Sequence, residues 1–323
     1  MNREFIFSDP RIIKWLNDDC ISVVGDDWYR RRAKDDASVW FSGIARKAGR
    51  GKNGSTQQGS YLVTANGDLL AFINTSEPEK FILSMMQGKK RWKQLKPEQR
   101  TATIPAMQTH DYKVNVKPID PAKDLVIKVQ SRALSETDGK LTRWDSQGQV
   151  GSKATLGHLW VKQSEWAGFA HELKQLADFE HLDIPPFLSH RIARFHLNDN
   201  TRGEGPAWKN SEIKKVAFEC IKLDDGYDIR GSFQLETANK TRSFSGSLQG
   251  KLILEKGSSL RPKSWRMVAY GKHSGEGPHT RNARPGAQTL AFNFDFLPKP
   301  KPLDLVPPQH MRWQQGYWQA EKH

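Results

Sequence analysis

The sequence predicts an α+β protein in two parts, an N-terminal α/β unit and a larger domain built on an antiparallel sheet. In the first part a helix, a strand, a helix, a hairpin and a helix follow one another. In the second part, long runs of alternating apolar and polar residues are separated by turns that contain glycine and aspartate. The chain has 323 residues, a length at which single cores usually give way to two domains.

The N-terminal elements follow from capping and turn signals. The stretch 8–19, SDPRIIKWLNDD, predicts a helix that begins at Pro10, and the apolar run Cys20–Gly25 predicts a short buried strand. Residues 28–47 predict a second helix. A hairpin is predicted over 61–74 because Asn66-Gly67 favours a tight turn, and a helix over 77–95 follows it.

Prolines mark the predicted domain boundaries. The N-terminal unit covers 1–96, and 97–123 contains four prolines and predicts a connector. The β-rich domain covers 124–298. The tail 299–323 is rich in proline and lysine, and Trp313, Tyr317 and Trp318 are the side chains that could dock it.

Within the β-rich domain, periodicity predicts both helices and strands. The helices are expected at 165–179 and 186–195. Alternation of apolar and polar residues predicts a series of strands at 125–129, 216–220, 227–235, 244–255, 265–271 and 289–296. Aspartate and glycine at 224–226 predict a turn between two of them.

The net charge of +14 predicts partners that carry negative charge. We expect an anionic ligand or an acidic protein surface. Non-specific nucleic-acid binding is an alternative, although no RNP-type run, paired Cys and His or helix-turn-helix is present. The basic clusters 30–32 and 89–93 lie in predicted helices and are equally explained as solvated faces.

The cysteines and histidines give no sign of a metal or a cofactor, and we expect neither. Cys20 and Cys220 are two hundred residues apart in apolar runs, which is typical of core residues. The spacing of His171, Glu172 and His181 fits no compact zinc pattern.

No apolar stretch is long enough for a transmembrane helix, and the first ten residues carry charge where a secretory signal needs an apolar run. As written, the sequence predicts a cytoplasmic protein. A sequence that is truncated at its N-terminus would instead be expected to be secreted or periplasmic.

The N-terminal part resembles the C-terminal two-thirds of a thioredoxin-like domain. The resemblance covers about a third of the chain, and it rests on two groups of residues: Ser8, Asp9, Pro10, Ile13, Leu16, Asn17, Asp18, Cys20, Ile21 and Val23 in the first, and Gly59, Tyr61, Thr64, Gly67, Leu69, Leu70 and Ala71 in the second. The chain lacks a Cys-x-x-Cys pair, and the position of the family's cis-proline falls at Gly59 or Ser60.

The resemblance therefore implies a redox-inactive relative with a degenerate, N-terminally incomplete domain. Strands that precede the first helix in that family have no counterpart in this sequence. A gap inside a sheet would leave backbone groups unpaired, at a cost of a few kcal/mol each. Either another segment fills the gap, or the sheet is rearranged, or the sequence is a shortened copy of a longer protein.

The second part also resembles a group of bacterial proteins to which no activity is assigned. The resemblance rests on one run that contains Arg191, Ala193, Arg194, Phe195, His196, Leu197, Asp199, Asn200, Arg202 and Gly203. It implies a shared domain and supplies no mechanism.

Two loops, 196–208 and 272–286, each contain Gly-Glu-Gly-Pro with arginine and histidine beside it. Such loops could line an anion-binding pocket, because glycine lets the backbone approach a ligand and arginine forks match carboxylate or phosphate. The candidate ligand-binding residues are Arg202, Glu204, His279, Arg281 and Arg284. The alternative is that these are two tight turns at strand ends.

We favour a non-catalytic binding protein. The alternative enzyme would be a hydrolase that uses His196 with Asp199 or Glu204 as acid, base and orienting group. A catalytic site should bring His196 and His279 into one pocket with carboxylates, whereas a binding surface would leave the loops open.

Overall fold

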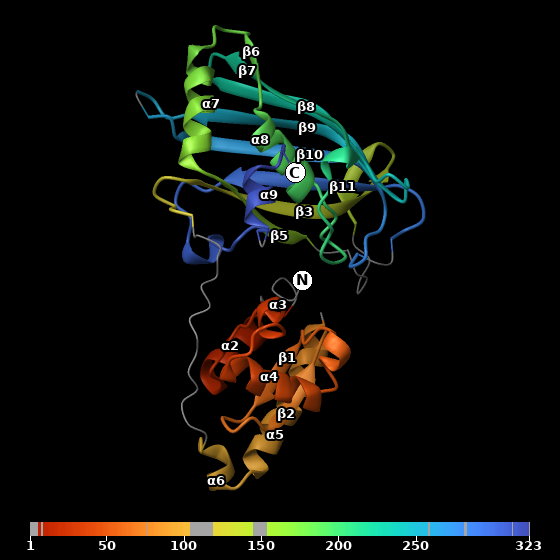
Figure 1. The fold of residues 1–323 in the computed structure, drawn as a ribbon. Coiled ribbons are helices and arrows are strands. Elements are labelled where there is room, and N and C mark those ends of the chain that lie inside the picture. The colour runs from red at the N-terminus through yellow and green to blue at the C-terminus, as the bar shows by residue number, and fades with distance from the viewer. Residues whose placement is uncertain are drawn as a thin grey trace. The chain divides into compact units, whose positions relative to one another are not determined.

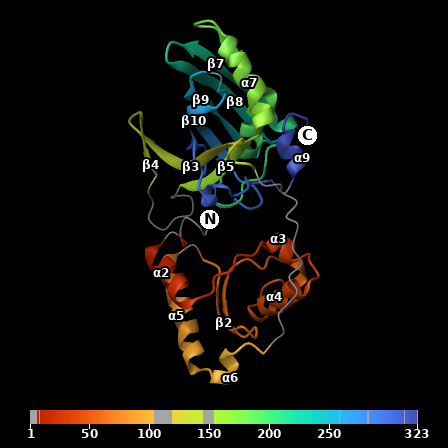
Figure 2. The same ribbon diagram turned by 90° about the vertical axis from the view of Figure 1, so that its left-hand side faces the viewer.

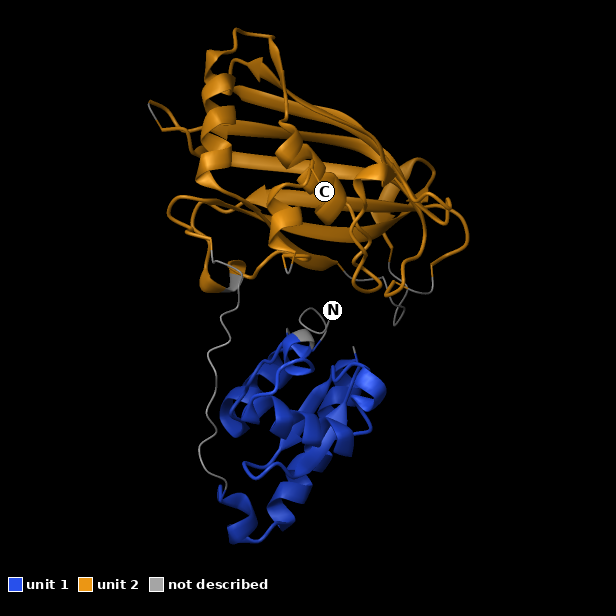
Figure 3. Ribbon diagram, in the orientation of Figure 1, with its two compact units in different colours: residues 1–113 blue, residues 114–323 orange. Residues whose placement is uncertain are grey.

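The computed structural model describes residues 6–7, 9–75, 77–103, 119–144, 154–257, 259–280, 283–311 and 313–322. The chain forms two compact units, residues 1–113 and 114–323 (Figure 3). The division falls inside the stretch 97–123 that the prolines mark as a connector. Each unit is described by itself.

The described residues of the first unit form helices and a hairpin (Figure 1). Its elements are α2 (Pro10–Asp19), α3 (Asp27–Arg30), α4 (Asp36–Lys47), η1 (Lys52–Gly54), β1 (Ser60–Val63), β2 (Leu69–Ile73), α5 (Pro78–Gln94) and α6 (Pro97–Arg100). Strands β1 and β2 pair antiparallel.

The predicted hairpin, the helix that begins at Pro10 and the helix that follows the hairpin are confirmed. Gly67 has a φ of +85°, and a Cβ there would lie 2.8 Å from Nε1 of Trp40, so the turn requires glycine. The Asp9 side chain caps α2 by accepting from the Arg11 N–H. Ile12 of α2 and Phe81 and Met85 of α5 are buried in one cluster beside β2.

Two predictions in this unit are wrong. Residues Cys20–Gly25 form no strand, because an apolar run becomes a strand only when another strand pairs with it. The helix predicted over 28–47 is divided into α3 and α4. Asp35 causes the division, since its side chain accepts from the Ser38 N–H and starts a new helix.

The described residues of the second unit form a large sheet with helices α7, α8 and α9 (Figure 1). Its strands are β3 (Leu125–Thr137), β4 (Lys140–Arg143), β5 (Thr155–Val161), β6 (His181–Asp183), β7 (Ile213–Leu223), β8 (Gly226–Glu236), β9 (Arg242–Leu254), β10 (Pro262–Gly275) and β11 (Gln288–Phe296). Its helical segments are α7 (Gln163–Gln175), α8 (Pro186–Arg191), the π-helical turn η2 (Ile192–His196), the short turns η3 (Asn210–Glu212) and η4 (Pro302–Asp304), and α9 (Gln314–Trp318).

In the described residues, nine strands form one antiparallel sheet in the order β4-β3-β11-β10-β9-β8-β7-β6, and β5 also pairs with β3. The α+β class and the antiparallel β-rich sheet are therefore confirmed. Strands β7 to β11 are neighbours in sequence and in space, joined by turns such as the predicted one before Gly226. Strands β4, β5 and β6 were not predicted.

Helices α7, α8 and α9 lie in front of the sheet in Figure 1, and α7 and α9 lie to its right in the turned view of Figure 2. Side chains on that face are apolar and buried, as in β8, where Tyr227, Ile229 and Phe233 alternate with polar residues. The opposite face carries exposed side chains such as Arg230 and Tyr270. The sheet is thus covered by helices on one face and solvated on the other.

Docking of the tail by Tyr317 is confirmed, because this side chain is fully buried in the core of the second unit. Trp313 remains 46% exposed. Within the described ranges, no helix has both the length and the apolar composition needed to cross a bilayer.

Glycines on the central strands allow neighbouring backbones to approach closely. A Cβ on Gly246 would lie 2.1 Å from the carbonyl oxygen of Tyr270, and one on Gly271 would lie 2.0 Å from that of Ser245. Gly246 and Gly271 are directly opposite one another in β9 and β10. Glycine at such sites marks a bend or a close backbone approach.

We therefore predict that Gly246→Ala lowers the free energy of unfolding by about 1–3 kcal/mol, the usual cost of overpacking. Denaturant titration of the full chain measures this change. Gly157→Ala in β5 is the matched control, because nothing lies within 4 Å of a Cβ there. Equal effects of the two variants would contradict the prediction.

Candidate functional site

The two Gly-Glu-Gly-Pro loops are in direct contact. A Cβ on Gly203 would lie 1.8 Å from the carbonyl oxygen of His279, and one on Gly277 would lie 2.6 Å from Cδ of Pro206. The two motifs begin at Gly203 and Gly275, 72 residues apart, the first between η2 and η3 and the second at the turn from β10 to β11. Glycine at these positions therefore allows the two loops to pack closely against each other.

Arg202 fastens the two loops together from the inside. Its Nε donates to Oδ2 of Asp199 at 2.6 Å, and its two terminal nitrogens donate to the carbonyl oxygens of Thr280 and Gly275. Asp199 also accepts from the backbone and the hydroxyl of Thr201. Arg202 and Asp199 are 7% and 4% exposed. The guanidinium fork thus binds the protein's own backbone.

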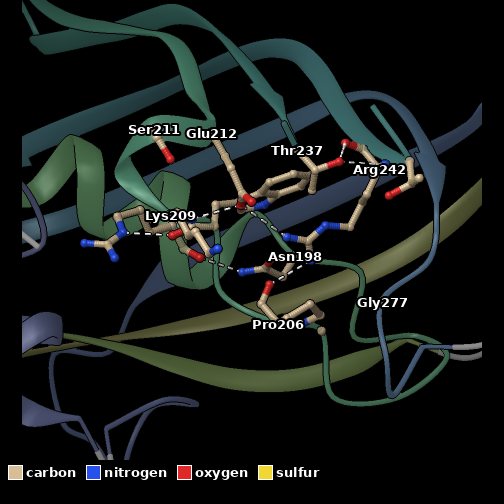
Figure 4. A network of polar contacts seen from close by, with 12 residues as sticks. Asn198, Pro206, Lys209, Ser211, Glu212, Thr237, Arg242 and Gly277 are labelled. Atoms are coloured by element: carbon tan, nitrogen blue, oxygen red, sulfur yellow. Dashed lines mark hydrogen bonds and ion pairs between the residues drawn. The ribbon is translucent and has the colours of Figure 1, made fainter. Parts of the chain in front are cut away.

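A second buried arginine, Arg242, braces the same region from β9 (Figure 4). Its guanidinium lies 3.7 Å from the centre of the Trp208 ring and donates to the carbonyl oxygen of Pro206 at 2.8 Å. Glu212 lies 3.8 Å from the same guanidinium. Burial lowers the pKa of Arg242, while Glu212 partly offsets that effect.

Two more buried arginines hold the C-terminal segment. Arg191 donates to the carbonyl oxygens of Tyr317 and Trp318 and pairs with Glu165 at 2.6 Å. Arg194 donates to the carbonyl oxygen of Ala320 at 2.6 Å. These contacts anchor α9 against the chain that leaves α8.

His196 belongs to this anchor. Its Nε2 lies 3.0 Å from the hydroxyl oxygen of Tyr317, which accepts from the backbone N–H of Trp160. The hydroxyl therefore donates to Nε2, and we infer a neutral ring that carries its proton on Nδ1. Burial and the nearby charge of Arg191 lower the pKa of His196 to about 3, and burial raises that of Tyr317.

The three residues proposed for a hydrolase each have a different environment. His196 bonds to Tyr317, Asp199 bonds to Arg202 and Thr201, and Glu204 is exposed. The described contacts join none of the three to another. His279 is also exposed, whereas His196 is 5% exposed, so the two rings do not line one open pocket.

Arg284 is the predicted ligand-binding residue that keeps an exposed guanidinium at this end of the sheet. The guanidinium lies 3.4 Å from the centre of the Trp144 ring, at the end of β4. Among the described residues, no carboxylate forms an ion pair with Arg284. Its partial desolvation lowers the pKa of Arg284, but arginine stays charged in proteins. Arg281 lies outside the described residues.

Sequence reasoning missed Trp144, Arg242 and the roles of Arg191 and Arg194. A signal existed for Arg191 and Arg194, since both lie with Arg202 in the single run 191–203. Nothing in the sequence marks Arg242, because the partners of its guanidinium lie 30 or more residues away.

Comparisons with protein-family models, with curated proteins and with solved structures gave no match. Where the structure describes the chain, no group of three or more His, Cys, Asp or Glu is placed to hold a metal ion. What this end of the sheet can bind must therefore be inferred from its geometry. A buried network fixes the loops, and an exposed cation is stacked on an indole ring.

We predict that Arg202→Met lowers the free energy of unfolding by about 3–5 kcal/mol, because it leaves the Asp199 carboxylate buried without its cation. Denaturant titration measures the loss. Arg230→Met is the control, since Arg230 pairs with Glu219 on the exposed face and such pairs contribute about 0–1 kcal/mol. A small effect at Arg202 would show that the loops do not depend on it.

His196 makes the fold sensitive to acid. Between about pH 3 and pH 6.5 the unfolded chain binds a proton on this ring that the folded chain does not bind. The free energy of unfolding therefore falls as the pH falls through this window. Burial lowers the pKa of His273 to about 4, which acts in the same direction.

We predict that His196→Gln, which keeps a polar partner for Tyr317, loses less stability than the unchanged protein between pH 6.5 and pH 3. Denaturation midpoints measured across this range check the difference in slope. His181→Gln is the control, because His181 is exposed on β6. Parallel pH profiles for His196→Gln and the unchanged protein would contradict the buried neutral ring.

Proposed function

We propose that this chain is a non-catalytic binding protein. It binds an anionic ligand or an acidic protein surface at the loop end of the second unit, where loops 196–208 and 272–286 meet. The observation that carries the proposal is Arg284, an exposed cation stacked on Trp144 at 3.4 Å. The net charge of +14 attracts the same class of partner.

Stacking on the indole ring of Trp144 holds the Arg284 side chain in place for binding an anion. An indole face restricts the flexible side chain, so less conformational entropy is lost when the guanidinium binds. The edge of the guanidinium keeps its donors, which match the two oxygens of a carboxylate or a phosphate. No described carboxylate pairs with Arg284, so among the described residues an incoming anion would meet no competing ion pair.

The rest of the loop end supports this use. The backbone of His279 is fixed against Gly203, while its imidazole is exposed and can donate to the same ligand. Glu204 is also exposed, and because its carboxylate repels anions we place the anion at Arg284 rather than beside Glu204. Arg281 remains a proposed contributor on the basis of its sequence position.

The same geometry gives less support to the hydrolase. A general base must reach the proton that it abstracts, and His196 has its Nε2 on Tyr317 inside the core. Asp199 is held by Arg202. Neither group could touch a substrate without opening the loops.

For the first unit we propose a redox-inactive relative of thioredoxin-like domains. The observed hairpin β1–β2 between helices α4 and α5 supports the proposal, as does the lack of a Cys-x-x-Cys pair in the sequence. Both cysteines are free, and burial raises the pKa of each thiol.

We predict that Arg284→Ala weakens the binding of poly-L-glutamate by about fivefold to tenfold, the cost of about one charge-assisted hydrogen-bonded contact. Titration calorimetry with the full chain at fixed ionic strength measures it. Arg266→Ala is the matched control, because Arg266 is exposed on the open sheet face and pairs with Asp295.

Two results would contradict this proposal. Equal losses for Arg284→Ala and Arg266→Ala would mean that binding follows net charge rather than a site. Tighter binding of single-stranded DNA, with affinity that falls steeply as salt rises, would favour the nucleic-acid alternative.

A further inference from the structure

Helix α5 of the first unit presents one stripe of side chains to solvent. Its members follow one another at spacings of three and four residues and therefore lie in one line on the helix: Leu83, Met86, Lys90 and Lys93. All four are exposed, and Leu83 and Met86 are 62% and 61% exposed. Other side chains of α5 are buried in the core of the first unit. The stripe thus combines two apolar side chains with two cations on the face that the fold leaves uncovered.

Positive charge gathers at the C-terminal end of this stripe. Residues 89–100, in α5 and α6, include six lysines and arginines and a single carboxylate. In the part of the chain that the structure describes, five of these exposed cations form no ion pair with a carboxylate: Lys90, Arg91, Lys93, Lys96 and Arg100. The two arginines donate to carbonyl oxygens, of Leu70 and Lys93, which do not neutralise their charge.

Carboxylates that contact α5 are already paired with other cations. Asp19 of α2 pairs with Lys89 at 2.6 Å, which is the sixth cation of residues 89–100. Glu79, at the start of α5, pairs with Arg11 of α2 at 2.7 Å. The five cations therefore keep their charge, and a surface of this sign attracts an anionic surface.

We propose that the exposed stripe of α5 binds the surface of a bilayer that contains anionic phospholipids. The lysines would lie at the level of the lipid phosphates, and Leu83 and Met86 would enter the boundary between the headgroups and the acyl chains. The helix would lie in the plane of the interface and would not cross it. The stripe belongs to the first unit, so this inference is independent of the anion site proposed for the second.

The apolar part of the stripe favours a lipid surface over a nucleic acid. A phosphodiester backbone offers Leu83 and Met86 no apolar environment, whereas the acyl boundary removes both from water. Single-stranded nucleic acids are commonly bound by exposed aromatic rings on which bases stack. Trp92, the aromatic residue among these cations, is half-buried and lies 5.8 Å from the guanidinium carbon of Arg100. Helix α5 thus offers an insertion surface and no exposed ring for stacking.

Several weak contributions would act together in this attachment. Each lysine or arginine close to an anionic leaflet strengthens binding by about fivefold, and a leucine that is partly removed from water adds a similar factor. Lysine stems can lie along the apolar boundary while the ammonium groups reach the phosphates. Binding should therefore be reversible and should weaken as salt rises. A second copy of α5 is disfavoured as the occupant, because its cations would repel those of the first.

The test uses the full chain and sedimented vesicles of phosphatidylcholine and phosphatidylserine in equal parts. We expect these vesicles to bind the chain and vesicles of phosphatidylcholine alone to bind it far more weakly. Lys90→Gln/Lys93→Gln should weaken binding by about twentyfold, since each cation contributes about fivefold. Lys34→Gln/Lys52→Gln is the matched control, because both lysines are exposed in the same unit and neither lies on α5. Lys90→Arg/Lys93→Arg, which keeps the charge, should bind as the unchanged chain does.

A second pair of variants tests the apolar part of the stripe. Leu83→Ser should weaken vesicle binding by about fivefold, because serine gains nothing by entering the acyl boundary. Val39→Ser is the control, since Val39 is 58% exposed on α4 of the same unit, and it should leave binding unchanged.

The proposal is overturned if the two kinds of vesicle bind equally well, or if either control loses as much affinity as the variant that it matches. DNA or poly-L-glutamate that binds more tightly than the mixed vesicles, and loses that affinity in Lys90→Gln/Lys93→Gln, would identify a nucleic acid or an acidic protein as the occupant. That result would also overturn it. Loss of vesicle binding in Arg284→Ala would place the contact in the second unit and would overturn it as well.

Discussion

Burying a guanidinium is tolerated only when its charge and its donors are satisfied, and the second unit is organised around this constraint. In the described residues, four arginines are buried: Arg191, Arg194, Arg202 and Arg242. Each donates to backbone carbonyl oxygens, which lie in a loop, at the end of β10, or in and just after α9. Arginine suits this role because its five donors are fixed in a plane and can bind several carbonyls at once. The loops and the C-terminal segment are therefore held by charge-assisted hydrogen bonds rather than by regular structure.

This arrangement changes how the polar residues of the loops are interpreted. Histidine, aspartate and arginine at short spacing are typical of catalytic sites, yet the same groups are needed wherever irregular backbone is buried. His196 and Asp199 each have a structural partner, Tyr317 and Arg202, and both are nearly inaccessible. A functional interpretation is better based on the groups that remain exposed and uncompensated. Among the described residues at this end of the sheet, that condition selects Arg284 on Trp144.

Patterns among neighbouring residues predicted much of the fold, whereas contacts between residues far apart in the sequence were not predicted. Alternation predicted the long strands β7 to β11, and Asn66-Gly67 predicted the first hairpin, because both depend on neighbouring residues. Strands β4 and β6 are only four and three residues long, too short for a pattern to stand out. The shared residues of the two glycine-rich loops were compatible with one pocket or with two separate turns, and nothing in the sequence indicated which way the Arg202 guanidinium faces. Sequence alone cannot tell whether an arginine faces a ligand or a carbonyl of its own chain.

The failed strand at Cys20–Gly25 shows where sequence reasoning reaches its physical limit. A β pattern describes what a segment can do when another strand is present, and it carries no information about whether that strand exists. The strand predicted at 216–220 formed as part of β7, because β8 follows after a two-residue turn and supplies the ladder. Cys20–Gly25 has helices on both sides in sequence, so its partner had to come from farther away, and the described chain provides none. The segment thus keeps the composition of a buried strand while Ile21, Val23 and Val24 remain exposed.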